Sequence, residues 1–341
     1  MVLGLMAFSS FLVLLICLRR YYRNFHARRR ARHNKVYDQL IGAAVNNPDD
    51  AKAAKKLVKY RGCTSAFTRS LLMHFRTVQG YRTDQLRLLV ENSSLERRII
   101  RATKKGTRGY RMRAVQILSY LQTDVSLKCI RAHLRSKNRY ERLTAARALT
   151  RRRSMEDCGH IVSSLVASFP RKLDLLTEML VKFGPDIQPF LEQIAVQSKK
   201  KDVIVACLEA LVVLAPASTM LDLAHFISDD DNRIRAAAVA LSAVSEDVRG
   251  SDLLLQGLSD DTIKVKIRSA KIAANLSRPD VAPALYTLTK DPSFWVKYWA
   301  SRGIWKLGKT GRQMIESIAN SNEEGSQMAG EVAREMGAGH V

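Results

Sequence analysis

Apolar positions recur along the chain with a long period, which predicts a series of paired helices. From Tyr110 onward, similar segments begin every 31 residues, and apolar or small side chains favour positions 0, 4, 7 and 11 of each segment. These positions share one face of a helix. A second apolar patch lies 18 to 24 residues after each opening. Each unit is therefore predicted to be two antiparallel helices, named A for the later patch and B for the opening. The seven openings are Tyr110, Glu141, Lys172, Val203, Ile234, Val265 and Val296.

Small residues and helix-ending residues support this pairing. Position 4 of the openings is mostly small, which lets a second helix approach closely; it holds Ala114, Ala145, Leu176, Cys207, Ala238, Ser269 and Ala300. Glycine or proline stands between each late B helix and the next A helix, as at Pro216, Pro279 and Gly308. A helix pair this short cannot bury its apolar face alone, so we expect stacked pairs that form an all-α solenoid with one continuous core.

Acidic residues also repeat, in the turns that lead from A to B. Asp229, Asp260 and Asp291 are 31 residues apart, and a basic residue follows each of them six positions later. These bases are Arg235, Lys266 and Lys297. An acid in each turn and a base early in each B helix are predicted to form a structural ladder of ion pairs between neighbouring units.

These features resemble HEAT repeats. The turn aspartate, the V/I-R/K-x-x-A opening and the following Gly or Pro are most similar to the short HEAT-like repeats of about 30 residues that also occur in bilin lyases and bacterial scaffold proteins. The resemblance covers 110–319 and is strongest from 203 onward. It is degenerate over 36–109, where two altered units are expected to form a helical N-terminal cap, and 320–341 is expected to be a polar tail. The resemblance implies a right-handed, ARM-type superhelix of antiparallel helix pairs.

The N-terminus carries an uncharged run. Residues 2–18 contain no charged side chain, and as a helix they would span about 26 Å, slightly less than the hydrocarbon core of about 30 Å. No basic residue precedes the run, which disfavours a cleaved signal peptide. We therefore expect 1–18 to be one transmembrane helix and 19–35 a polybasic juxtamembrane segment. The positive-inside rule then predicts a single-pass protein of the inner (plasma) membrane, with its N-terminus outside and its solenoid cytoplasmic.

Charge is concentrated in the N-terminal half. The chain has 56 basic and 32 acidic residues, a net charge of +24, and residues 1–171 alone carry a net +26. A negatively charged partner is therefore expected near this half. Anionic lipid headgroups are favoured, and nucleic acid is disfavoured because of the expected anchor. The candidate contacts with an anionic surface are Arg19, Arg20, Arg23, Arg28, Arg29, Arg30, Arg32, Lys35, Arg151, Arg152 and Arg153.

Candidate chemistry is sparse. The histidines form no HExxH motif, no phosphate-binding glycine motif is present, and the five cysteines are scattered without a CxxC pair. The cysteines are interpreted as small apolar fillers in a reducing compartment. Hydrophobic residues make up 46% of the chain, which excludes general disorder, and aromatic residues make up 7%, which argues against an all-β fold. We expect no catalytic residue, metal, cofactor or small-molecule substrate, and hence no enzyme.

Aromatic residues gather in the last clear repeat. Trp295 and Trp299 fall at positions −1 and 3 of the opening at Val296, off the core stripe. They are either a C-terminal cap or a partner-binding site. The partner-binding candidates are Trp295, Tyr298, Trp299 and Trp305.

The sequence therefore favours a membrane-anchored HEAT-repeat scaffold or adaptor that binds a protein partner at the cytoplasmic face of the membrane. Two alternatives stay open. One is an accessory or lyase-like subunit of an enzyme system, which the resemblance suggests. The other is nucleic-acid binding through the basic N-terminal half.

Overall fold

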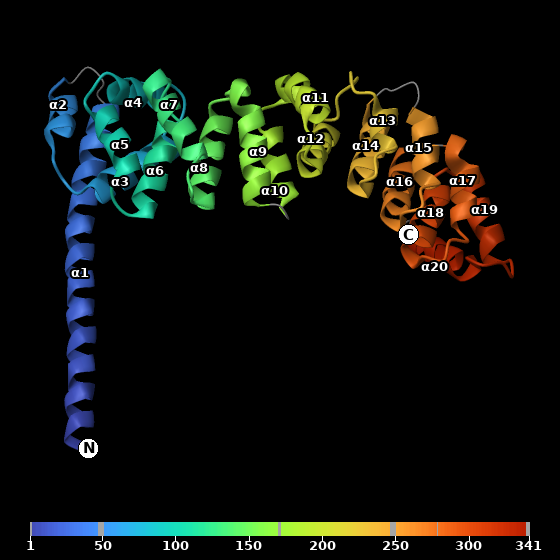
Figure 1. Ribbon diagram of the computed structural model, residues 1–341, viewed down its shortest axis with the longest axis horizontal. Helices are drawn as coiled ribbons and strands as arrows, with labels where there is room; N and C mark the ends of the chain where they lie inside the picture. The colour runs from blue at the N-terminus through green and yellow to red at the C-terminus, as the bar shows by residue number, and fades with distance from the viewer. Residues whose placement is uncertain (1, 47–50, 170–171, 246–249, 278, 339–341) are drawn as a thin grey trace. The chain divides into compact units, whose positions relative to one another are not determined.

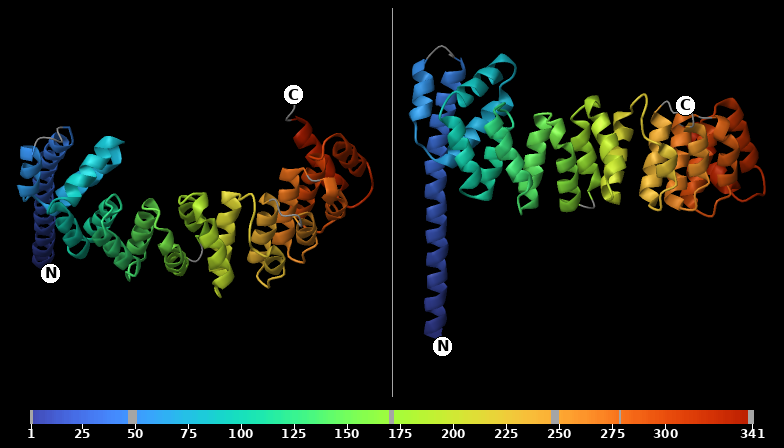
Figure 2. Two further views of the ribbon diagram at one scale, coloured as in Figure 1. Left: turned by 90° about the horizontal axis from the view of Figure 1, so that it is seen from above. Right: turned by 45° about the horizontal axis from the view of Figure 1, so that its top comes forward.

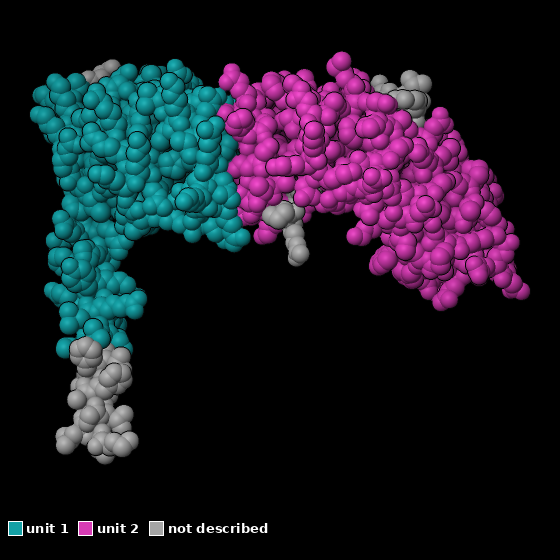
Figure 3. Space-filling view, in the orientation of Figure 1, with its two compact units in different colours: residues 1–154 teal, residues 155–341 magenta. Residues whose placement is uncertain are grey.

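The computed structural model describes residues 2–46, 51–169, 172–245, 250–277 and 279–338 (Figure 1). Within these ranges the chain forms helices and their connections, and no strand occurs. The chain divides into two compact units, residues 1–154 and 155–341 (Figure 3). Each unit is a stack of helices, and each is described by itself below.

Unit 1 stacks its helices in two rows. In one row the second half of α1 packs on α3, α3 on α6 and α6 on α8; in the other, α5 packs on α7. The first half of α1 extends away from the rest of the unit (Figure 1). The helices are α1 Val2–Asn46, α2 Ala51–Lys59, α3 Thr64–Thr77, α4 Tyr81–Glu91, α5 Leu95–Lys104, α6 Arg108–Leu118, α7 Asp124–Leu134 and α8 Arg139–Arg151.

Unit 2 repeats the same plan more regularly (Figure 2). The even-numbered helices from α10 to α20 pack on one another in a row of B helices, and each packs on the A helix that precedes it. The A helices are α9 Cys158–Ser168, α11 Gln188–Gln197, α13 Leu223–Ile227, α15 Gly250–Leu258, α17 Ala282–Leu288 and α19 Lys309–Ala319. The B helices are α10 Leu173–Val181, α12 Lys201–Leu214, α14 Asn232–Val244, α16 Ile263–Leu276, α18 Phe294–Trp305 and α20 Ser326–Ala338. Short 3₁₀ turns, η1 Met155–Asp157, η2 Pro185–Ile187 and η3 Pro279–Val281, lead into three A helices.

The predicted helix pairs are confirmed. All seven openings fall in or directly before B helices, from α6 in unit 1 to α18 in unit 2. The small residues at position 4, such as Ala145, Ala238 and Ala300, are fully buried where neighbouring helices meet. Both units are therefore all-α stacks of antiparallel helix pairs. The expected polar tail contains a further helix, α20, which packs on α18 and α19 and extends the B row.

The 31-residue phase is lost before residue 108. The helix that packs on α6 is α3, which starts 44 residues before it, because the additional helix α4 lies between α3 and α5. The buried side chains Tyr37, Ile41 and Phe67 join α1 to α3 in a core of their own. Residues 36–109 thus contain the end of α1 and four further helices.

The expected membrane anchor is a wrong prediction. The uncharged run is the start of α1, which continues as one helix through the basic segment to Asn46. Side chains of residues 2–13 lie outside the described residues, and the described part of the chain holds no helix that is long and apolar enough to cross a membrane. This finding overturns the transmembrane helix at 1–18, the single-pass localisation and the orientation derived from it. The run of about 26 Å is shorter than the hydrocarbon core, and charged residues follow it within the same helix.

Candidate functional site

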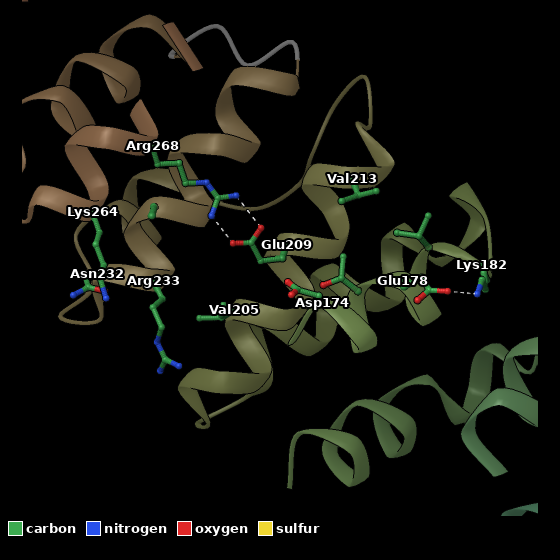
Figure 4. Close-up of a pocket in the computed structure, with 13 residues that line it drawn as sticks. Asp174, Glu178, Lys182, Val205, Glu209, Val213, Asn232, Arg233, Lys264 and Arg268 are labelled. Carbon is green, nitrogen blue, oxygen red and sulfur yellow. Dashed lines mark hydrogen bonds and ion pairs between the residues drawn. The ribbon is translucent and has the colours of Figure 1, made fainter. Parts of the chain in front are cut away.

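A groove crosses the B helices of unit 2 (Figure 4). It has a volume of about 790 Å³ and is lined by side chains of α10, α12, α14 and α16. We name it the B-groove. Its apolar lining includes Val181, Val205, Val213 and Ala236.

The repeat itself places the groove residues. Positions −1, 2 and 6 of each B helix lie off the core stripe formed by positions 0, 4, 7 and 11. At position 2, Val205 and Ala236 are only 2% and 7% exposed, and they form part of the apolar floor of the groove. Asp174 and Val205 occupy position 2 of their openings, and Glu178 and Glu209 occupy position 6. The lining therefore repeats at positions 2 and 6 of successive helices, whereas Arg268 comes from position 3 of its opening.

An ion pair spans the groove. Arg268 of α16 donates from both terminal nitrogens to Glu209 of α12, with Nη2 2.8 Å from Oε2. The pair joins α12 and α16, the B helices on either side of α14, whose lining residues include the small Ala236. Both side chains are only partly exposed.

The two ends of the groove differ in charge. Asp174 and Glu178 stand at the α10 end, and Lys264 and Arg268 stand at the α16 end. Glu178 forms an ion pair with Lys182, and Arg233 binds Asp202 and Asp231 at 2.6 and 2.7 Å. Lys264 is exposed and makes no ion pair within the described residues. The groove thus offers carboxylates at one end and cations at the other.

The next B helix, α18, presents an aromatic cluster formed by Phe294, Trp295, Tyr298 and Trp299. The Trp295 ring meets the rings of Phe294 and Tyr298 edge-on, with centroids 5.2 and 5.9 Å away. Trp295 is 56% exposed, and Phe294 is exposed to a similar extent. Exposed aromatic rings held in a fixed array are typical of surfaces that bind a partner.

Cations and the last helix hold this cluster in place. Lys271 of α16 lies over the Trp299 ring at 4.7 Å, and the guanidinium of Arg302 lies 5.4 Å from the same ring. Glu335 of α20 accepts hydrogen bonds from Tyr298 at 3.0 Å and from Arg302 at 2.7 Å. Trp299 is therefore half-buried and rigidly positioned, whereas Trp295 stays open to solvent.

Trp305 differs from the other three candidates. It is 7% exposed, and Arg312 of α19 lies 5.6 Å from its ring centroid. The contact with Arg312 shows that the Trp305 ring faces α19, the first helix of the next pair. In this structure Trp305 is a core residue and is not accessible to a partner.

Two acid–base pairs of the predicted ladder form between neighbouring helix pairs of unit 2. Arg235 binds Asp260 through two hydrogen bonds of 2.7 and 3.0 Å, and Lys266 lies 2.8 Å from Asp291. Each base thus contacts the aspartate of the following turn. The first aspartate, Asp229, pairs instead with Lys201 at 2.5 Å.

Lys297 makes no ion pair within the described residues, and its sequence position explains this. The turn that follows it holds Asn322 where the repeat would place an aspartate. The row of pairs therefore stops at α18.

Removal of the ion pair between Arg235 and Asp260 is expected to lower the stability of unit 2. Burial alone would raise the pKa of Asp260, but the hydrogen bond from Arg235 holds that pKa below its usual value, so its stabilisation is present at neutral pH and lost on acidification. Asp260 also accepts a hydrogen bond from the Thr262 backbone N–H at 2.8 Å. Asp260→Ala should cost about 2 kcal/mol in the free energy of unfolding, measured by urea denaturation at neutral pH. The neighbouring exposed Asp261→Ala is the matched control, and an equal loss in both variants would contradict the ladder.

The basic candidates are spread over unit 1. The eight from Arg19 to Lys35 are exposed along α1. Arg151 lies over the Tyr120 ring at 4.5 Å, and Arg152 donates to Ser126 Oγ at 2.6 Å. Arg152 is therefore bound within its own unit, and Arg153, at a positive φ of 51°, ends α8.

A cysteine–histidine pair in unit 1 was not expected from the sequence. Both ring nitrogens of His133 face backbone carbonyls, Nδ1 that of Cys129 at 3.0 Å and Nε2 that of Thr103 at 3.2 Å. The hydrogen bond with the Cys129 thiol raises the pKa of His133 to about 9, and the pKa of Cys129 is lowered by the same contact although burial opposes it. The i, i+4 spacing on one helix is the only sequence signal for this pair.

The raised pKa of His133 predicts a pH-dependent stability. Because the folded pKa lies above the unfolded value of about 6.5, the imidazolium stabilises unit 1 fully below that pH. The contribution, on the order of 1 kcal/mol after solvent screening, should be lost as the pH rises toward about 9. Urea denaturation over this range should show the loss in the wild type and not in His133→Gln. His160→Gln, at an exposed site, should behave as the wild type; a loss that persists in His133→Gln would contradict the assignment.

No three histidine, cysteine, aspartate or glutamate side chains meet as metal ligands among the described residues. The fold is an α-solenoid built from short antiparallel helix pairs.

No family model and no curated protein matches the chain. Among solved structures, the chain is similar to the karyopherin Kap121p. The complex of Kap121p with the SUMO protease Ulp1p gives a TM-score of 0.37 at 13% identity, over 87% of this chain and 45% of that one. A triple mutant of Kap121p gives 0.38 at 13% identity, again over 87% and 45%. Kap121p bound to Pho4p gives 0.36 at 13% identity, over 86% and 45%. The chain thus spans less than half the length of these karyopherins.

Proposed function

We propose that this protein is a scaffold that binds an extended segment of a protein partner along the B helices of unit 2. The observation that supports this most is that the B-groove and the aromatic cluster lie on successive B helices of one row, α16 and α18. An apolar floor, a few placed charges and exposed aromatic rings are the features that peptide-binding surfaces combine.

The dimensions of the groove suggest the length of the bound segment. Helix axes pack about 10 Å apart, so three steps from α10 to α16 span about 30 Å. An extended chain covers about 3.3 Å per residue, so about nine residues would cross the groove. One further step would bring the segment to the aromatic cluster on α18.

The charges suggest the composition of that segment. Asp174 and Glu178 favour a basic side chain at the α10 end, and Lys264 favours an acidic side chain at the α16 end. The exposed Trp295 favours an apolar or proline residue beyond it. This combination gives the segment a direction as well as a composition.

Selection from a random peptide library on the purified full chain tests the proposal. Enriched peptides should carry basic residues at one end and apolar residues at the other, and their binding should be lost in a Glu178→Lys variant. Lys199→Glu, on the exposed turn between α11 and α12 and outside the residues that line the groove, is the charge-reversal control. Peptides without a charge pattern, or peptides that bind both variants equally, would argue against the B-groove.

A further inference from the structure

A second pocket lies in unit 1 where α1, α3 and α6 meet. It has a volume of about 610 Å³. Each of the three helices contributes one arginine to its lining: Arg30 from α1, Arg69 from α3 and Arg113 from α6. No carboxylate stands among the described residues that line this pocket. Three cations from separate parts of the sequence therefore converge on one space without a counter-charge.

The three arginines form few hydrogen bonds to the rest of the protein. Arg113 donates from Nη2 to Ser65 Oγ at a long 3.4 Å, and its Nε is buried without any partner. Arg30 donates only to the backbone of its own helix, to the carbonyl of His26 at 3.1 Å. None of the three makes an ion pair within the described residues. Arg30 and Arg69 are exposed, whereas Arg113 is partly buried and lies 5.3 Å from the Tyr110 ring centroid without a counter-ion. A partly buried cation without a counter-ion is costly, and its N–H groups remain available to a ligand.

The electrostatic state of Arg113 reflects this crowding. Burial lowers the pKa of its guanidinium, and the neighbouring charges of Arg69 and Arg30 lower it further, against an opposite effect of Tyr110. A bound anion would relieve both the desolvation and the repulsion.

Two further groups in the pocket point to a polar ligand. The pocket includes Thr107 and Gly109 at the start of the 11-residue helix α6, and Thr107 makes no side-chain capping hydrogen bond. The first backbone N–H groups of a helix have no acceptor inside the helix and favour negative charge. Asn34 of α1 has its amide Oδ1 buried without a partner, where it could accept a hydrogen bond from a ligand hydroxyl.

We propose that this pocket binds a phosphate group, carried either by a small soluble ligand or by a lipid headgroup. Guanidinium groups match phosphate oxygens in pairs, so three arginines can surround one phosphate. The site lies in unit 1 and is independent of the partner surface proposed for unit 2. Occupancy would tie α1 to α3 and α6 by a shared counter-charge.

Titration of the full chain with inorganic phosphate, at constant ionic strength, tests the proposal. Phosphate should raise the melting temperature of the wild type, and Arg113→Gln should weaken binding by about tenfold or more in calorimetry. The same variant should be as stable as the wild type, or more stable, without phosphate, because it removes a desolvated cation. Arg97→Gln, an exposed arginine of α5 outside the pocket, should bind phosphate within about twofold of the wild type.

Three results would overturn the proposal. The first is a wild type whose melting temperature and calorimetric titration do not respond to phosphate. The second is an equal loss in Arg97→Gln, which would indicate general charge attraction. The third is an Arg113→Gln variant that melts lower without phosphate yet keeps the phosphate response, which would make Arg113 structural only.

A second measurement distinguishes the two sources of phosphate. Phosphatidylcholine vesicles that contain a phosphatidylinositol phosphate should bind the wild type and not Arg113→Gln if the ligand is a lipid headgroup. If the ligand is soluble, free inositol phosphate should bind through Arg113 while the vesicles do not. Either pattern supports a phosphate site, and the absence of both overturns it.

Discussion

Trp305→Ala should unfold unit 2 at a markedly lower temperature than the wild type. The Trp305 side chain is the last of α18, is 7% exposed and packs against α19 of the next helix pair. Truncation of a buried tryptophan to alanine costs about 3–5 kcal/mol through lost burial and the cavity that remains. For a unit of this size, that free energy corresponds to a fall of about 10 °C in melting temperature.

Circular dichroism during heating of the full chain measures this fall. Trp305→Phe is the matched control, because it keeps an aromatic ring in the same space and should recover most of the loss. A change of less than about 1 kcal/mol in the alanine variant would place Trp305 at the surface. It would then return to the set of partner-binding candidates.

Trp295→Ala should have the opposite signature. Its ring is more than half exposed, so its loss should change the free energy of unfolding by less than about 0.5 kcal/mol. A central anchor of an interface contributes about 2 kcal/mol or more, so the affinity for peptides selected on the wild type should fall about 30-fold. Calorimetric titration of the purified variant with such a peptide measures the fall.

The control for Trp295 is an exposed aromatic residue elsewhere. Tyr81 in unit 1 is 76% exposed, so Tyr81→Ala should leave both the affinity and the melting temperature unchanged. If Trp295→Ala lowered the melting temperature as Trp305→Ala does and left the affinity intact, the aromatic cluster would be a cap. The proposed partner-binding surface of unit 2 would then lack its central contact, Trp295.

The sequence predicted the regular part of the fold because its packing is local. Small residues such as Ala238 and Ala300 recur at one position, and each helix pair packs mainly on the next. The same logic failed before residue 108, where α4 adds a helix and the spacing between α3 and α6 leaves the period. The uncharged run at the N-terminus also predicted an anchor wrongly, because it continues as one helix into the basic segment.

The candidate site was predictable only in part, for a similar reason. The positions of Trp295 and Trp299 relative to the repeat placed them off the core stripe. The burial of Trp305 depends on Arg312 and on α19, which the repeat pattern alone does not position. The ion pair between Glu209 and Arg268 joins residues 59 positions apart, on the two helices that flank α14. A local sequence pattern therefore could not predict it.

The three-arginine pocket illustrates the limit most clearly. Arg30 and Arg69 come from the part of the chain where the repeat period fails, and Arg113 comes from the first regular repeat, so alignment of units could not derive their convergence. The sequence showed only that the N-terminal half is strongly basic. Only the tertiary packing of α1, α3 and α6 determines which three of the many basic residues line the same pocket.

Site-specific photo-crosslinking in the full chain tests the central claim most directly. A photoreactive residue at Val213, exposed in the B-groove, is compared with one at Val196, which is exposed on the A helix α11. With a selected peptide present, the account predicts adducts from position 213 that disappear in the Trp295→Ala background, and none from position 196. Equal adducts from both positions, or adducts from position 196 alone, would contradict a partner-binding surface on the B helices of unit 2.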